Sequence, residues 1–117
     1  MYTKHLVKNY ETPPAGGNPR ETEAWALMQA AVRMNQAKEV GDKSAMLAAV
    51  RLNWQLWTII QADLLAPDCP IDLELRSNVL SLAKFIDKHT MQFLGDPQAD
   101  RLDVLININR ELSAGVT

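Results

Sequence analysis

The fold is decided by the stretch at residues 46–65, which reads MLAAVRLNWQLWTIIQADLL. Placed on a helix, Arg51, Gln55 and Thr58 share one narrow polar stripe, and large apolar side chains fill most of the remaining circumference. A helix with so wide an apolar arc lies at the centre of a core, or keeps an extra apolar face for a partner. We therefore predict a central helix over residues 43–66.

Three polar residues, Asn53, Gln61 and Asp63, lie inside this apolar arc. Buried polar groups need hydrogen-bond partners, so we expect these three to bond across to other helices or to a bound chain.

The aromatic residues of the same helix differ in their expected burial. The spacing places Trp57 and Leu56 in the core and leaves Trp54 partly exposed.

Capping and stop signals mark the helices before and after this stretch. The first is predicted over residues 19–39, because Asn18 can cap it, Pro19 suits its first position and Gly41 can end it. Residue Asp42 or Ser44 then caps the central helix.

The helix predicted over residues 71–94 follows Asp68 or Asp72 as its cap and ends at Gly95. Its apolar seam includes one histidine that we expect at the edge of the core with a hydrogen bond: Leu75, Val79, Leu82, Ile86, His89 and Phe93.

A last helix is predicted over residues 98–113, with Gly115 as its end. Its inner stripe consists of Leu102, Leu105, Ile106, Asn109 and Leu112.

Four helices joined by short turns predict an all-α fold, an antiparallel four-helix bundle over residues 19–117. The preceding residues 1–18 form an N-terminal arm and a linker, because Thr12–Pro19 reads TPPAGGNP and cannot be regular structure. We expect this short arm to be flexible.

Composition excludes several classes of protein. The chain has 117 residues, 47% of them hydrophobic, which fits one globular domain. Its 12 basic and 14 acidic residues interleave, so no direct nucleic-acid binding is expected. The longest apolar stretch, Leu52–Ala62, is too short for a membrane span, and no secretory signal begins the chain. We expect a cytoplasmic protein.

Catalytic and metal-binding patterns are absent from the sequence. His5 and His89 have no second ligand nearby, and Cys69 stands beside an acidic residue that disfavours its thiolate. Glu21 and Glu23 are most simply interpreted as charges favoured by a helix N-terminus. We therefore expect no enzymatic activity, no metal and no cofactor.

Several fragments in series resemble the FlaF family of flagellar biosynthesis regulators. The central one is Asn53-x-x-Leu56-Trp57-Thr58, within Arg51–Ile59. The others are, in order, Met1-Tyr2, Tyr10, Pro19-Arg20-Glu21, Asp63-Leu64, Leu75-Arg76, Ser81-Leu82, Leu105–Arg110 and Gly115. Two departures are Trp54, where a basic residue is expected, and Ala83-Lys84-Phe85, where an aromatic–aliphatic pair is expected.

The resemblance implies a non-enzymatic, cytoplasmic protein needed for making and exporting flagellin. Its implied partners are flagellin and FlbT, a regulator that acts on flagellin messenger RNA. A flagellin-binding chaperone fits best, because the apolar terminal helices of flagellin need a cover before assembly. Two alternatives stay open: a translational regulator acting with FlbT, and a structural adaptor in flagellum assembly. The sequence leaves the oligomeric state open.

Partner contacts are predicted on the arm, on the central helix and on the last helix. The arm carries aromatic and apolar side chains that could imitate a ligand and lie over the apolar surface shared by the central helix and its neighbours. The predicted contact residues are Tyr2, Leu6, Tyr10, Asn53, Trp54, Trp57 and Asn109.

Overall fold

A computed structural model describes residues 19–116 of the chain, which form four α-helices and one short 3₁₀ turn. The helices are α2 (Pro19–Val40), α3 (Lys43–Leu65), α4 (Leu73–Gly95) and α5 (Leu102–Val116), and the turn is η1 (Ala99–Arg101). No strand occurs between residues 19 and 116. The predicted all-α fold is therefore confirmed, while Tyr2, Leu6 and Tyr10 of the predicted arm lie outside the described residues.

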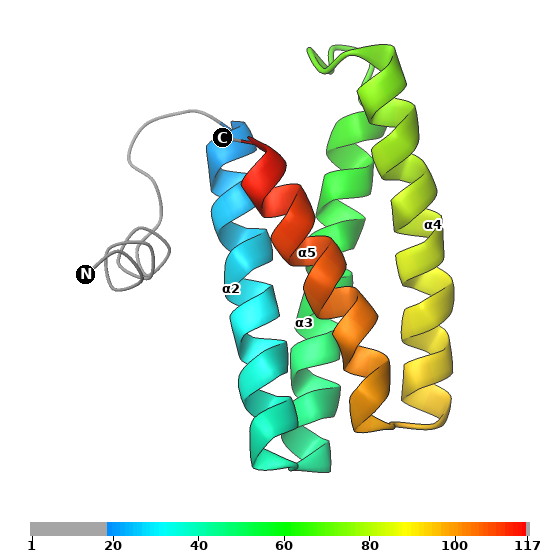
Figure 1. Cartoon of the computed structure of the whole chain (residues 1–117). Helices are drawn as coiled ribbons and strands as arrows, with labels where there is room; N and C mark the ends of the chain where they lie inside the picture. Colours follow the sequence, from blue (N-terminus) through cyan, green and yellow to red (C-terminus); the bar gives the residue numbers. More distant parts are fainter. Residues whose placement is uncertain (1–18, 117) are drawn as a thin grey trace, which may run out of the picture.

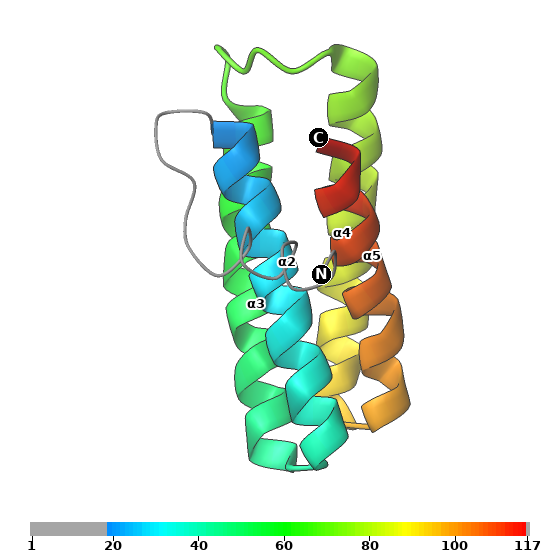
Figure 2. The same cartoon turned by 60° about the vertical axis from the view of Figure 1, so that its left-hand side comes forward.

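Consecutive helices run in opposite directions (Figure 1). The helix α2 packs against both α3 and α5, and α3 packs in turn against α4. The last helix, α5, starts beside the end of α4 and crosses the bundle towards the beginning of α2 (Figures 1 and 2). The start of α2, the end of α3, the start of α4 and the end of α5 thus meet at one end of the bundle.

Local capping fixes the junctions between helices, as the sequence predicts. The backbone N–H of Gly41 donates to the carbonyls of Ala37 and Lys38, and its φ of +76° is readily adopted only by glycine. The carboxylate of Asp42 then accepts from the Ser44 N–H at 3.1 Å, which begins α3.

The cap predicted at Asp72 is confirmed, but the first residues of α4 and of the last helix differ from the prediction. Asp72 caps α4 by accepting from the N–H groups of Glu74 and Leu75, so α4 begins two residues later than expected. The region predicted as the first turn of the last helix is the separate turn η1, because Gln98 makes no side-chain cap. Gly115 does not end α5, which continues to Val116.

The core lies between all four helices and follows most of the predicted apolar stripes, but Leu75 of the predicted α4 seam is exposed. Its largest fully buried side chain is that of Trp57, which confirms the predicted burial, whereas Leu56 is only half-buried. The other large, fully buried apolar side chains are Leu27, Met34, Val50, Ile86, Phe93, Leu102 and Leu105.

Candidate functional site

Three of the predicted contact residues form a buried network inside the bundle. The indole N–H of Trp57 donates to Asn109 Oδ1 at 3.0 Å, and Asn109 Nδ2 donates to Asn53 Oδ1 at 2.7 Å. The same Nδ2 also donates to the carbonyl of Leu27 at 3.2 Å, which links α5 to α2. All three side chains are fully buried, so in this structure their contacts are internal.

Of the four predicted contact residues that the structure describes, Trp54 is the one whose side chain is partly exposed. It is half-buried, as expected, and its indole N–H donates to Asp87 Oδ1 of α4 at 2.8 Å. Gln61 Nε2 donates to the other oxygen of Asp87 at 3.2 Å. Asp87 therefore anchors α4 on α3, a role that sequence reasoning missed because the spacing of Trp54 and Gln61 gives no hint of their common acceptor.

An apolar groove runs along the outer side of the α2–α3 pair, where no other described helix covers it. It is open and shallow, with a volume of about 370 Å³. Its apolar walls come from small side chains and two larger ones: Ala37, Val40, Ala45, Ala48, Ala49 and Leu52. Two side chains on this side are strongly exposed, Val40 at 76% and Leu52 at 46%.

Ile59 lies two helical turns beyond Leu52 on the same face of α3, outside the lining of the groove. Its side chain is 59% exposed. The wide apolar arc predicted for the central helix is therefore divided between the core and a face that none of the helices within residues 19–116 covers. Small side chains along this face would let another helix approach closely.

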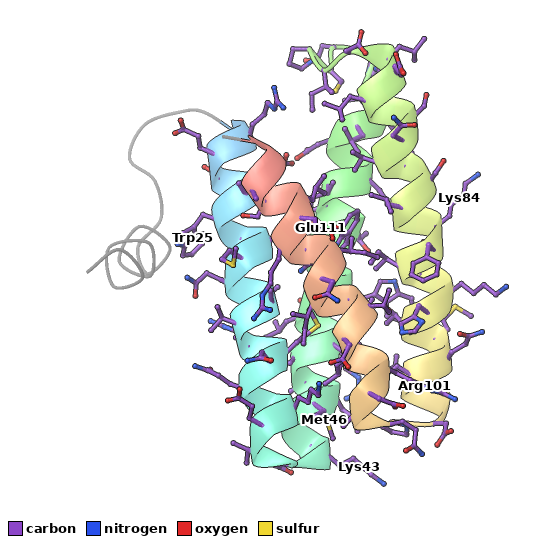
Figure 3. All side chains as sticks on the ribbon, in the orientation of Figure 1. Trp25, Lys43, Met46, Lys84, Arg101 and Glu111 are labelled. Atoms are coloured by element: carbon purple, nitrogen blue, oxygen red, sulfur yellow. The ribbon has the colours of Figure 1, made fainter. Side chains whose placement is uncertain are left out.

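A second apolar site lies at the end of the bundle where four helix ends meet. Its cavity has a volume of about 160 Å³ and an apolar wall formed by Leu27, Ile60, Leu64, Ile71, Leu75, Val79 and Leu112. Three charged residues, Arg20, Glu23 and Glu111, also line it. Glu111 projects from the second half of α5 (Figure 3).

Glu23 is half-buried and forms a side-chain hydrogen bond with Asp63 of α3. Burial, the hydrogen bond with Asp63 and the charge of Asp63 all raise the pKa of the Glu23 carboxyl, which is about 7; burial contributes most. The nearby Arg20 opposes this shift. Glu23 is therefore not a simple helix-end charge, as the sequence suggested, but one half of a carboxyl pair between α2 and α3.

The three polar residues of the central apolar arc all bond to other helices, as predicted. Asn53 bonds to α5, Gln61 to α4 and Asp63 to α2. His89 also has the expected place at the edge of the core: its Nε2–H donates to the carbonyl of Arg101 at 2.7 Å, and its ring stacks on Phe85. Among residues 19–116, no three His, Cys, Asp or Glu side chains cluster as metal ligands would.

The fold and its two apolar sites define a small all-α bundle. The family model of the flagellar protein FlaF matches residues 8–116, almost the whole length, and the chain therefore belongs to the FlaF family. No curated protein and no solved structure matches the chain significantly. Between residues 19 and 116, none of the helices has the length together with the hydropathy that a membrane span requires.

Proposed function

We propose that this chain is a cytoplasmic flagellin-binding chaperone, needed for the synthesis and secretion of flagellin. Membership of the FlaF family makes it a flagellar protein. The observation that carries the finer proposal is the uncovered apolar face of α3, with Leu52 and Ile59 exposed beside the α2–α3 groove.

An amphipathic helix binds such a groove by laying its own apolar face into it. The terminal helices of a flagellin subunit have an apolar face of this kind, which is unpaired until the subunit enters the filament. Covering that face would protect both proteins from aggregation, because each would otherwise expose a contiguous apolar surface to water.

Co-purification with flagellin tests the proposal. The chain is produced together with flagellin as wild type, as Leu52→Glu and as Met91→Glu. Met91 is exposed on α4 at 61% and does not line the α2–α3 groove, so its substitution is a matched control. We expect Leu52→Glu to lose most of the bound flagellin and Met91→Glu to retain it, with circular dichroism showing that both are folded.

If the wild-type bundle is folded and retains no flagellin, the chaperone proposal fails. Two alternative functions would then remain: a translational regulator acting with FlbT, and a structural adaptor in flagellum assembly.

Deletion of residues 1–12 tests the predicted contacts at Tyr2, Leu6 and Tyr10. Weaker flagellin binding would make this segment part of the binding surface. Unchanged or tighter binding would instead indicate that the segment competes with flagellin for the groove.

A further inference from the structure

The cavity at the end of the bundle has the size of one side chain. Its volume of about 160 Å³ is close to that of engineered apolar cavities, about 150 Å³, which stay dry and accept a benzene ring. Its wall includes Leu27, Leu64 and Leu112, from three different helices. A leucine, methionine or phenylalanine side chain would therefore fill it.

The mouth of the cavity carries an excess of acidic groups. Glu23 of α2 and Glu111 of α5 line it, and Asp63 of α3 bonds to Glu23. Arg20 is the basic residue among those lining it, and the wall on the side of α4 is apolar. Two carboxyl groups in contact repel each other when both are ionised, and Arg20 offsets this repulsion only in part, because the pKa of Glu23 is still raised.

The size of the cavity also indicates what kind of molecule supplies the ligand. Pockets for free small molecules usually measure about 300–1,000 Å³ and bury most of the ligand. This cavity is smaller, and it opens beside Leu75, which is 39% exposed. Leu65 and Leu73, at the same end of the bundle, are exposed at 68% and 67%. An anchor side chain from a larger partner, surrounded by further apolar contacts, fits this arrangement.

We propose that this cavity binds one apolar side chain of a partner protein, together with a neighbouring lysine or arginine that pairs with Glu23 and Asp63. The proposal concerns a second site, separate from the α2–α3 groove, and does not depend on flagellin being the partner. The cation replaces the shared proton, which is released to solvent, and forms charge-assisted hydrogen bonds with the two carboxylates.

Because a cation replaces the proton at Glu23, binding depends on pH. The charged groups around Glu23 are Arg20 of α2, Asp63 of α3 and Glu111 of α5. Since Glu23 has to ionise before it pairs with the cation, and its pKa is about 7, affinity should increase with pH. Between about pH 6 and about pH 8 the expected gain is roughly ten-fold.

Methyl NMR of the full chain tests the proposal with two designed helical peptides. One carries a leucine followed four positions later by a lysine, and the other has glutamate in place of that lysine. The Leu–Lys peptide should shift the methyl signals of Leu27, Leu64 and Leu112 and bind at least ten-fold more tightly than the Leu–Glu peptide. Equal affinities, or shifts confined to other methyl groups, would overturn the proposal.

Two carboxyl substitutions serve as a matched pair. Glu23→Gln keeps the shape of the side chain but removes its charge, so it should abolish the pH dependence and reduce the preference for lysine, which Asp63 alone would then support. Glu21→Gln makes the same change on an exposed residue that does not line the cavity, and should leave both unchanged. Identical behaviour of the two variants would contradict the assigned role of Glu23.

A third variant, Leu75→Trp, fills the cavity from its half-open rim and should prevent binding of both peptides. Its melting temperature and its far-ultraviolet circular dichroism serve as folding controls. Undiminished peptide binding by a folded Leu75→Trp chain would overturn the proposal. Free hexylamine provides the last comparison: binding as tight as that of the Leu–Lys peptide would indicate a small-molecule amine site and overturn the assignment to a partner protein.

Discussion

Asn109 connects three helices through a single side-chain amide. It accepts from Trp57 of α3 and donates both to Asn53 of α3 and to the carbonyl of Leu27 of α2. Such a network fixes the relative position of the helices, because a shift along any axis leaves a buried polar group without a partner. Asn53, Trp57 and Asn109 all lie in the sequence fragments that resemble the FlaF family. In the structure, their hydrogen bonds fix how the helices are positioned along one another.

Replacement of Asn109 by alanine is expected to destabilise the fold by on the order of 3 kcal/mol, because Trp57 Nε1 and Asn53 Oδ1 lose their partners in a buried site. Urea unfolding measures the change. Asn107→Ala, on the exposed side of the same helix, should stay within about 0.5 kcal/mol of wild type. Similar losses in both variants would contradict the proposed importance of the network.

The tryptophans of α3 should differ in the same assay. Trp57 is fully buried, so Trp57→Ala should reduce the free energy of unfolding by about 3–5 kcal/mol. Trp54 is half-buried with its hydrogen bond to Asp87, and Trp54→Ala should have a smaller effect. An unchanged melting temperature for Trp57→Ala would show that this residue is not a core residue.

The carboxyl pair Glu23–Asp63 should make stability depend on pH. The pKa of Glu23 rises from 4.5 to about 7 on folding, so the folded chain retains a proton that the unfolded chain has lost. The stability that the protonated Glu23 contributes is fully present below about pH 4.5 and is lost as pH rises through about 7.

Thermal melts of wild type and Glu23→Gln, at about pH 5 and about pH 8, check this dependence, since glutamine donates to Asp63 at either pH. Relative to wild type, Glu23→Gln should gain melting temperature at the higher pH. Parallel profiles for the two chains would argue against the pair.

At the scale of the helix, the junction between α2 and α3 depends on one left-handed residue. Gly41 has a φ of +76°, and a Cβ added there would meet no atom within 4 Å. Gly41→Ala should therefore destabilise through backbone strain alone, by about 1–2 kcal/mol.

Gly95→Ala is the matched control for Gly41→Ala. Gly95 also has open space around it but has no positive φ, so alanine should be neutral or slightly stabilising there. Chemical denaturation of both variants distinguishes the two effects, and equal losses would contradict the role assigned to the turn.

Helix ends that depend on local signals could be predicted from the sequence. Asp42 and Asp72 cap helices where a carboxylate can reach an N–H two residues further on, and Gly41 ends α2. The predicted end of the last helix at Gly115 was wrong, because glycine permits a helix end without requiring one. The start of the last helix was misplaced because Gln98 provides no cap to begin it directly.

At the scale of the whole molecule, the candidate sites could not be predicted in the same way. The pairing of Glu23 with Asp63 depends on the register between α2 and α3, which no spacing within either helix specifies. Trp54 and Gln61 share Asp87 as their acceptor because α4 packs against α3, and the sequence does not specify that packing. The wide apolar arc of α3 did predict a spare face, but not the groove that α2 forms beside it.

Direct RNA binding provides a further check on the whole molecule. The net charge is −2, and electrostatic attraction to phosphate dominates nucleic-acid affinity. The chain alone should therefore leave flagellin leader RNA unshifted in a gel at physiological salt. A shift that needs FlbT would favour the regulatory alternative, and a shift by the chain alone would contradict the expectation.

Hydrogen exchange on flagellin, with and without the purified chain, tests the central claim most directly. If the α2–α3 groove holds a terminal helix of flagellin, amides in that terminal segment should exchange more slowly in the mixture. Leu52→Glu should abolish this protection, whereas Met91→Glu should preserve it. Unchanged exchange in both flagellin termini, with the bundle folded and in excess, would contradict the account.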